Sequence, residues 1–256
     1  MITLLGHGYI GNGIAKALLE AGVPFAWPHH GDEWEPSGVI INAAGYTGTP
    51  NVDACEDNKA DCIYGNVAWP LLVESKAGGL PVIHISSGCV YTGYKDGGWL
   101  ETDSPNFGFP NGSFYAGCKA VSQNLFENWF SGKSYLLRIR MPLDAREHPK
   151  NFLTKLRKYQ KLIDARNSLS RVRDVAAAVV YFAQKLPPAG VYNLCNPGSV
   201  TTREVADFLG LQKEWFTEEE FAASVKAPRS FCVLNTDKMQ AIYRLPQIWD
   251  ALHDCR

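Results

Sequence analysis

Short apolar runs alternate with helix-like stretches along the first half of the chain. Each run is brief and bounded by turn residues, as in a buried strand; the five are Ile2–Leu5, Val23–Trp27, Gly38–Gly45, Pro81–Ser86 and Tyr135–Ile139. Helical stretches lie between them, at Ile14–Glu20, Asp53–Gly79 and Phe114–Phe130. Strands that alternate with helices pair in parallel and need helices on both faces. The pattern therefore predicts an α/β protein with a doubly wound parallel sheet.

The pattern changes after Pro142. A basic helix is expected at Asn151–Gln160, a short strand at Leu162–Ala165, an alanine-rich helix at Arg173–Lys185, a strand at Val191–Leu194 and several short helices at Thr201–Arg256. We expect residues 1–142 and 171–194 to form a Rossmann domain, and residues 143–170 and 195–256 to form a small mixed C-terminal lobe that binds the substrate. The basic helix fits a solvated face and a patch for an anionic substrate equally well.

Composition excludes several classes of protein. The net charge of −1 leaves no electrostatic footprint for nucleic acid or an anionic membrane surface. The seven cysteines are an odd number without a Cys-x-x-Cys pair, which favours reduced thiols over a disulfide framework or a metal site. No apolar run is long enough for a bilayer, and no basic leader precedes the first strand. A cytoplasmic protein without membrane contact is the expectation.

A glycine loop follows the first strand. Gly6, Gly8 and Gly11 have the spacing Gly-x-Gly-x-x-Gly, with Tyr9 and Ile10 inside it, and a helix follows. Such glycines let the backbone approach a pyrophosphate that rests on the helix N-terminus. The loop predicts a dinucleotide site.

The end of the second strand bears on the choice of dinucleotide. It reads Trp27-Pro28-His29-His30-Gly31, without the carboxylate that usually accepts from the ribose of NADH. NADPH is therefore favoured, although no arginine is present for its 2′-phosphate and NADH stays an alternative. The third strand ends in Asn42, Ala43, Ala44 and Gly45, which leave room for adenine or ribose.

Tyr115 and Lys119 are four residues apart, so on a helix they share one face. An ammonium near a phenol lowers its pKa toward the working range. Ser87 ends the fourth strand and could hold a carbonyl oxygen. Together the three residues suit protonation of a carbonyl oxygen while hydride arrives at its carbon; alone, the Tyr-Lys pair would be an ordinary helix face.

These features together resemble the extended short-chain dehydrogenase/reductase family. The resemblance is strongest to the nucleotide-rhamnose synthases, bifunctional 3,5-epimerase/4-reductases of UDP-4-keto-6-deoxyglucose, and weaker to dTDP-4-dehydrorhamnose reductases. The segments that carry it run through nearly the whole chain: Ile41–Glu56, Ser86–Tyr91, Gly112–Tyr115, Leu137–Pro142, Asn151–Lys155 and Ala227–Ser230. The glycine loop departs from the family, because most members have one residue more between the first two glycines.

The resemblance implies a role for each matching residue. Ser87, Tyr115 and Lys119 would be the reductase triad, with Asn66 as its supporting asparagine. Cys89, two residues after the triad serine, and Lys155 would be the acid/base residues of epimerisation. The remaining expectations are contacts, with cofactor for Met141 and Pro142 and with substrate for Gly88, Asn151 and Arg229.

The expected activity is 3,5-epimerisation followed by NADPH-dependent 4-keto reduction, which yields a nucleotide-L-rhamnose. A reductase without epimerase activity and a non-catalytic NADP(H) sensor are the alternatives. The nucleotide is left open between UDP, dTDP and GDP. The resemblance also implies a homodimer paired through helices near Asn66–Lys76 and Phe114–Phe130, and a separate 4,6-dehydratase that supplies the substrate.

Overall fold

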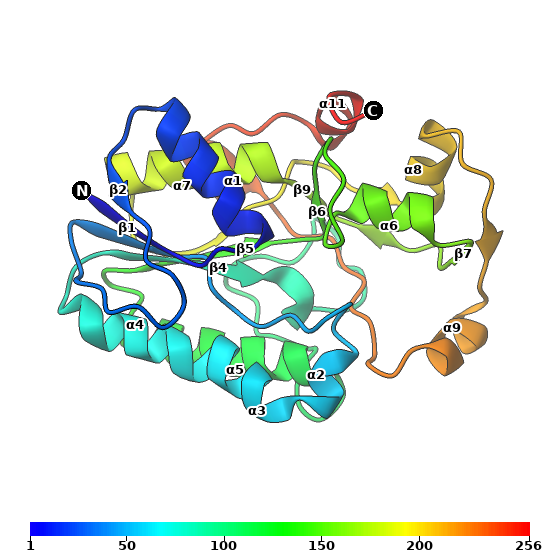
Figure 1. The fold of residues 1–256 in the computed structure, drawn as a ribbon. Coiled ribbons are helices and arrows are strands. Elements are labelled where there is room, and N and C mark those ends of the chain that lie inside the picture. Colours follow the sequence, from blue (N-terminus) through cyan, green and yellow to red (C-terminus); the bar gives the residue numbers. More distant parts are fainter.

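A six-stranded parallel sheet forms the centre of the computed structural model, which describes residues 1–256 (Figure 1). The strands lie in the order β2-β1-β3-β4-β5-β10. Their bounds are Phe25–Ala26 for β2, Ile2–Leu5 for β1, Val39–Asn42 for β3, Val82–Ser87 for β4, Tyr135–Ile139 for β5 and Gly190–Asn193 for β10. The chain leaves β1 toward β2 and returns to the other side of β1 as β3. The carboxyl ends of β1 and β3 therefore border the switch point at which α/β sheets bind ligands.

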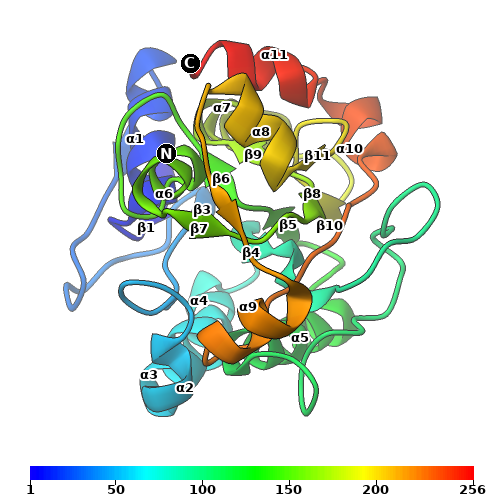
Figure 2. The ribbon, with the colours of Figure 1, turned by 90° about the vertical axis from the view of Figure 1, so that its right-hand side faces the viewer.

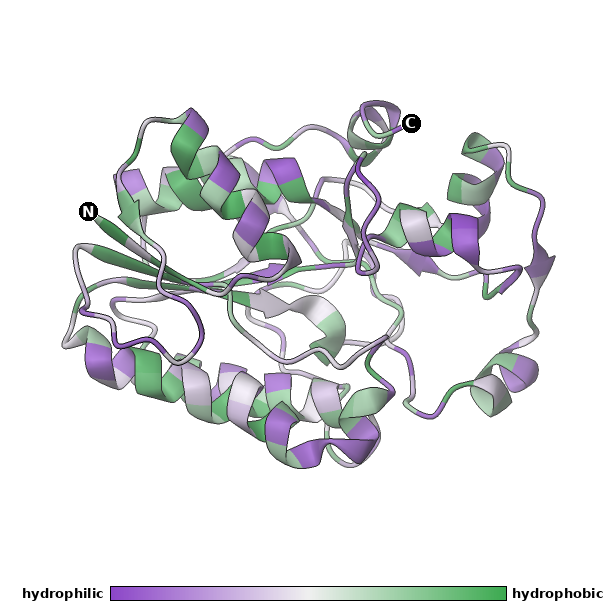
Figure 3. Cartoon of the chain, viewed as in Figure 1, coloured by the Kyte–Doolittle hydropathy of each residue, from purple (hydrophilic) through white to green (hydrophobic).

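Helices cover both faces of this sheet (Figure 1). One face carries α1 (Tyr9–Glu20) and α7 (Val172–Lys185). The opposite face carries α3 (Lys59–Ile63), a π-helical turn η1 (Tyr64–Ala68), α4 (Trp69–Ala77) and α5 (Phe114–Trp129), with the short α2 (Ala54–Asp57) before them. The central strands are mostly apolar, with His84 of β4 and Arg138 of β5 among the exceptions, while the helices alternate between apolar and polar faces (Figure 3). This is the difference expected between strands buried on both sides and helices with one solvated face.

A smaller lobe extends beyond the sheet and faces the viewer in Figure 2. Its strands form three pairs: β6 (Pro142–Leu143) with β9 (Ser170–Arg171), β8 (Arg166–Asn167) with β11 (Val200–Thr201), and β7 (Lys161–Leu162) with β12 (Glu214–Trp215). Its helices are α6 (Phe152–Lys158), α8 (Thr202–Phe208) and α9 (Glu218–Ser224), and α11 (Ile248–His253) packs against the same small core.

The predicted doubly wound parallel sheet is confirmed. The domain boundaries differ in the tail, because α10 (Asp237–Ile242) lies against β10 and its Met239 belongs to the core of the large sheet. Leu245 joins the same core. The stretch expected as a strand at Leu162–Ala165 keeps only Leu162 in a strand. No helix is both long and apolar enough to cross a bilayer.

The close packing of α1 on α7 gives a test of this fold. A Cβ added at Gly13 would lie 2.5 Å from Cγ1 of the buried Val172, so Gly13→Ala should lower the free energy of unfolding by about 1–3 kcal/mol despite the better helix propensity of alanine. Nothing lies within 4 Å of a Cβ at Gly132, so Gly132→Ala should change it by less than about 0.5 kcal/mol. Urea denaturation of both variants measures the difference, and equal stabilities would contradict this packing.

Candidate active site

The glycine loop lies directly against the turn that follows β3. Gly6 has a φ of 105°, and a Cβ there would come within 2.6 Å of the Ala44 nitrogen. A Cβ at Gly11 would lie 2.0 Å from the Gly6 carbonyl oxygen. Glycine is therefore required at both positions, whereas nothing lies within 4 Å of a Cβ at Gly8. The loop is tight on its protein side and open at Gly8.

The open side of this loop fits a pyrophosphate. Helix α1 begins at Tyr9 without a side-chain cap and without an acidic residue in its first turn. Its first N–H groups are thus free for an anion at the positive end of a 12-residue helix. The Tyr9 ring stacks on His148 at a centroid distance of 4.2 Å, which brings the segment before α6 over the loop.

Aromatic rings line the loop at the end of β2. His7 stacks on Trp27 at 4.2 Å and on His29 at 4.5 Å, and the Trp27 indole N–H donates to the Gly6 carbonyl oxygen. The stacking of these rings could not be read from the sequence, because it brings together residues of two separate segments.

The structure corrects the expectation that the Asn42 side chain borders the cofactor. Asn42 is 2% exposed, and its amide contacts His84 at 3.1 Å and the Trp69 indole at 3.1 Å on the α4 side of the sheet. The Asn42 side chain faces away from the glycine loop, toward His84 and Trp69. These buried polar groups satisfy one another's hydrogen bonds. The backbone of Ala43–Gly45 is what faces Gly6 and Lys119.

The predicted triad comes together at the carboxyl edge of the sheet. Ser87 is the last residue of β4 and opposes Ile139 of β5, and its hydroxyl accepts from the Cys89 N–H at 3.2 Å. Tyr115 and Lys119 share one face of α5, with the Lys119 nitrogen 5.8 Å from the Tyr115 ring centroid. Ser113 caps this helix by accepting from the Ala116 N–H at 3.1 Å. The cap fixes the turn that presents Tyr115.

The pKa of Tyr115 moves in the opposite direction from the one expected. Burial is the main cause and raises it well above the usual phenol value, while the Ser87 hydroxyl opposes the rise. Burial likewise lowers the pKa of Lys119. The expectation that Lys119 would bring Tyr115 toward neutrality was wrong, because loss of water outweighs the nearby ammonium. Tyr115 is therefore a protonated phenol, suited to donate.

Two polar groups without partners flank Gly45. The Asn66 carboxamide donates to the Tyr46 and Cys62 carbonyls, at 2.7 and 3.0 Å, but its Oδ1 is buried without a partner. A Cβ on Gly45 would lie 3.3 Å from this oxygen and 3.7 Å from the Lys119 nitrogen. A ribose has hydroxyls that can both donate and accept, so it fits between an unpaired acceptor and an ammonium. The geometry around Gly45 thus fits a ribose, as the open side of the glycine loop fits a pyrophosphate.

Cys89 lies beside the triad and is 9% exposed. Burial raises the pKa of its thiol, while the Ser87 hydroxyl, Arg140 and Lys119 act to lower it. The net direction is upward because burial dominates. Cys89 is a protonated thiol and suits the acid role.

Arg140 is a residue of this site that the sequence analysis did not single out. It follows β5, is 6% exposed, and donates to the Asn167 carboxamide at 2.7 Å and to the Ser230 carbonyl. Its Nε has no partner, and no carboxylate pairs with it. A buried cation without a counter-ion is costly and marks functional sites. The Leu-Arg-Ile-Arg-Met-Pro segment was the available signal.

Lys155 of α6 projects inward from the basic helix, whereas Arg157 and Lys158 are exposed. Burial lowers the pKa of Lys155, and the positive charges of Lys150 and Arg229 lower it further. This direction agrees with the expected acid/base role. The basic helix is thus divided between a solvated face and one lysine of the site.

Asn151 and Arg229 have partners within the protein. Asn151 is fully buried, caps α6 by accepting from the Leu153 N–H at 2.9 Å, and donates to the Asp144 and Arg146 carbonyls. The expectation of substrate contact is corrected, because this amide has no group left to offer. Arg229 binds Asp53 with both terminal nitrogens, at 2.9 and 2.8 Å. A contact between Arg229 and substrate stays a prediction.

The other expected contacts lie around the same edge. Gly88 begins the 3-10 turn η2 (Gly88–Val90), where a Cβ would lie 2.6 Å from a Leu234 methyl. Met141 and Pro142 follow Arg140 at the entry to the lobe and are half-buried. The segment 93–112 pairs with the tail of the chain, since the Trp99 N–H donates to the Val233 carbonyl at 2.8 Å.

Comparison with known proteins identifies the family. The profile of the RmlD substrate binding domain matches residues 26–251. The chain belongs to the RmlD substrate binding domain family. An Arabidopsis thaliana bifunctional dTDP-4-dehydrorhamnose 3,5-epimerase/dTDP-4-dehydrorhamnose reductase is 35% identical over 216 residues, which are 78% of this chain and 70% of that protein.

A second relative is much longer. An Arabidopsis thaliana trifunctional UDP-glucose 4,6-dehydratase/UDP-4-keto-6-deoxy-D-glucose 3,5-epimerase/UDP-4-keto-L-rhamnose-reductase is 32% identical over 78% of this chain. The match spans 31% of that protein, so this RmlD-family chain corresponds to about a third of it.

Solved structures share the fold. The L780 UDP-rhamnose synthase of Acanthamoeba polyphaga mimivirus superposes with a TM-score of 0.89 at 24% identity, over 100% of this chain and 98% of that one. The Bacillus anthracis dTDP-4-dehydrorhamnose reductase in complex with NADP gives a TM-score of 0.78 at 16% identity, over 98% and 96%. The predicted resemblance is confirmed.

The raised pKa of Cys89 has a measurable consequence. Alkylation requires the thiolate, so iodoacetamide should modify Cys89 slowly at pH 7, with a rate that climbs only above the usual thiol pKa of about 8.5. Peptide mass spectrometry across a pH series measures this, with Cys89→Ser to assign the labelled peptide. Fast labelling at pH 7 that does not depend on pH would show that Cys89 is already ionised.

Proposed function

We propose that this protein catalyses 3,5-epimerisation and NADPH-dependent 4-keto reduction of a nucleotide-4-keto-6-deoxyglucose, giving a nucleotide-L-rhamnose. The observation that carries the proposal is the burial of Cys89, Tyr115 and Lys119 beside the half-buried Ser87 at the carboxyl edge of the sheet, where the backbone of the glycine loop fits a dinucleotide. Membership of the RmlD family supports it, as do the activities for which the Arabidopsis relatives are named.

The cofactor would be held by the protein's own backbone and by two side chains. The free N–H groups at the start of α1 would bind its pyrophosphate, and Lys119 and Asn66 would bind the nicotinamide ribose. When bound, NADPH supplies hydride to C4 of the sugar. NADP bound to the Bacillus anthracis reductase, which has the same fold, supports the choice of cofactor.

Reduction needs a proton at the ketone oxygen, and Tyr115 is placed to supply it. Its raised pKa keeps the phenol protonated at neutral pH, so it donates to the oxygen as hydride reaches C4. Ser87 donates a second hydrogen bond to the same oxygen. Lys119, near the ring, stabilises the phenolate that remains.

Epimerisation uses the same oxygen as an electron sink. A base removes the proton at C3 or C5, the electron pair moves to the ketone oxygen, and Ser87 and Tyr115 stabilise the enolate. Lys155, whose pKa is lowered, is the better base, and Cys89, whose pKa is raised, is the better acid. Removal of a proton by Lys155 and return of one by Cys89 from the other face inverts the carbon.

Charge around the lobe favours an anionic substrate. The positive charge of Lys150 acts on Lys155, and those of Arg140 and Lys119 act on Cys89; Arg229 also acts on Lys155 but is itself paired with Asp53. Such a concentration of like charges is unfavourable until an anion enters. A nucleotide diphosphate supplies that anion. UDP and dTDP are the nucleotides in the relatives' names, so we propose one of these two as the carrier. A cytoplasmic location is also part of the proposal.

Two partners belong to the proposal. A separate 4,6-dehydratase would supply the 4-keto sugar, an activity that the longer relative carries in its own chain. A homodimer would form through the α3–α5 face, where apolar side chains are exposed: Ile63, Tyr64, Leu72 and Val121. Sedimentation at micromolar concentration should give twice the mass of the chain, and a monomer there would contradict the dimer.

Deuterium exchange separates the two activities. In D2O with UDP-4-keto-6-deoxyglucose and no cofactor, NMR should show deuterium entering C3 and C5, and added NADPH should then be oxidised. Tyr115→Phe should lower the rate of NADPH oxidation by about 100-fold or more while NADP still binds, because the proton donor is lost. Retained oxidation would rule out Tyr115 as the donor.

The two epimerisation residues should differ in this assay. Lys155→Met should abolish exchange at both carbons, because no base remains. Cys89→Ser should keep exchange, since Lys155 can return deuterium to the face from which it removed the proton, but it should stop inversion. If Lys155→Met kept exchange without inversion and Cys89→Ser abolished exchange, Cys89 would be the base and Lys155 the acid.

A reductase without epimerase activity is the second candidate, favoured by the position of Cys89 within an apolar cluster of buried cysteines. In that case the wild-type protein shows no exchange, and NADPH is oxidised only with a sugar that is already epimerised.

A further inference from the structure

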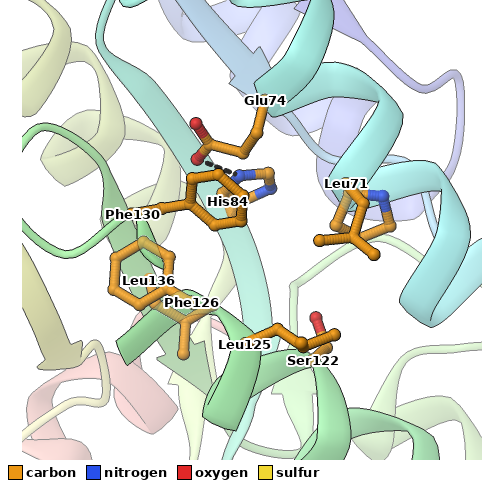
Figure 4. A pocket seen from close by; sticks show the side chains of 9 residues that line it. Leu71, Glu74, His84, Ser122, Leu125, Phe126, Phe130 and Leu136 are labelled. Carbon is orange, nitrogen blue, oxygen red and sulfur yellow. Dashed lines mark hydrogen bonds and ion pairs between the residues drawn. The ribbon is translucent and has the colours of Figure 1, made fainter. Parts of the chain in front are cut away.

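Three buried polar side chains form a chain of hydrogen bonds from α4 to the end of β3. Glu74 of α4 contacts the Nε2 of His84 at 2.9 Å, and the His84 Nδ1 lies 3.1 Å from the Asn42 amide nitrogen (Figure 4 shows the Glu74–His84 part). The Asn42 Oδ1 accepts from the Ala44 N–H at 3.2 Å and from the Trp69 indole N–H at 3.1 Å. We call Glu74, His84 and Asn42 the relay.

Donor and acceptor chemistry allows one arrangement of this relay. The backbone and indole N–H groups only donate, so the Asn42 group that they contact must be its oxygen. The Asn42 nitrogen, which only donates, then faces His84 Nδ1, which must accept. His84 therefore carries its proton on Nε2 and donates it to the Glu74 carboxylate.

The surroundings of His84 hold this arrangement in place. The pocket around it is lined by one carboxylate, Glu74, and otherwise by Ser122 and apolar side chains: Pro70, Leu71, Leu125, Phe126, Phe130 and Leu136. The Glu74 and His84 side chains are only 8% and 6% exposed. Water is thus a poor substitute for any lost partner, and each lost bond leaves a buried polar group unpaired.

The far end of the relay is the turn that borders the dinucleotide. Ala44, held by Asn42, lies against Gly6 of the glycine loop, and Gly45 lies between Asn66 and Lys119. The position of this turn sets the distance between the pyrophosphate loop and the ribose-binding lysine.

We propose that the relay is a positioning device for the cofactor, in which His84 acts through Asn42 to hold the Ala43–Gly45 turn in its dinucleotide-binding position. The proposal rests on the dinucleotide site of the proposed function. It assigns a role in NADPH affinity to Glu74 and His84, which do not face the glycine loop.

Two amide variants of His84 separate its two bonds. His84→Asn places a carboxamide oxygen near the position of Nδ1 and keeps the acceptor for Asn42, whereas His84→Gln places its amide near Nε2 and keeps only the Glu74 side. We expect His84→Asn to bind NADP within about threefold of wild type and His84→Gln to bind about tenfold more weakly. Isothermal titration calorimetry with NADP measures both without any sugar.

Turnover distinguishes positioning from a general loss of structure. For His84→Gln the KM for NADPH should rise, while the KM for the sugar and kcat at saturating NADPH stay within about twofold. Ser122→Ala, which removes a polar group from the same pocket but not from the relay, should leave all of these values unchanged.

Equal NADP affinity of the two amide variants, or weaker binding by His84→Asn, would overturn the proposal. So would a parallel loss of kcat and of thermal stability without a change in the KM for NADPH. A wild-type protein that binds NADP but reduces no sugar would contradict the proposed function and still leave the relay testable. If the wild type did not bind NADP, both would fail together.

Discussion

Loss of water at the carboxyl edge of the parallel sheet is the constraint on which the chemistry of this protein depends. Tyr115, Lys119 and Cys89 are each less than one-tenth exposed, and burial is the largest cause of the pKa shift in all three. A dry environment favours neutral forms, so acids keep their protons and amines lose theirs more readily. The result is a phenol and a thiol ready to donate, with Lys155 shifted toward the form that accepts.

This burial is possible because the backbone supplies most of the polar contacts. The glycine loop and the Ala43–Gly45 turn offer backbone N–H groups without large side chains, and the relay pairs the buried polar side chains behind this turn with one another. Among the charged side chains of this region, Lys150, Lys155 and Arg140 have no carboxylate within ion-pair distance. Positive charge is therefore in excess there. The site is arranged for a neutral ketone attached to an anionic carrier.

The sequence correctly predicted the positions of residues whose role depends on backbone conformation or on their place at the end of a strand or along a helix. The glycine loop, the serine at the end of β4 and the tyrosine one helical turn from its lysine all lie where the pattern placed them. It was a poor guide to asparagines. Asn42 and Asn151 looked like ligand contacts, yet both serve the fold, because an amide binds whichever partner the tertiary structure brings near.

The sequence by itself determined the layers of the fold, the place of the glycine loop and the helical spacing of Tyr115 and Lys119. These follow from the periodicity and spacing of residues that are close together in the chain, whereas the roles expected for Asn66, Cys89 and Lys155 came from the family resemblance. Only the tertiary structure decided the direction of each pKa shift, the unpaired Arg140 and the pairing of Arg229 with Asp53 across 176 residues of sequence. Burial and long-range pairing depend on contacts between segments far apart in the chain, so they cannot be predicted from a local sequence pattern.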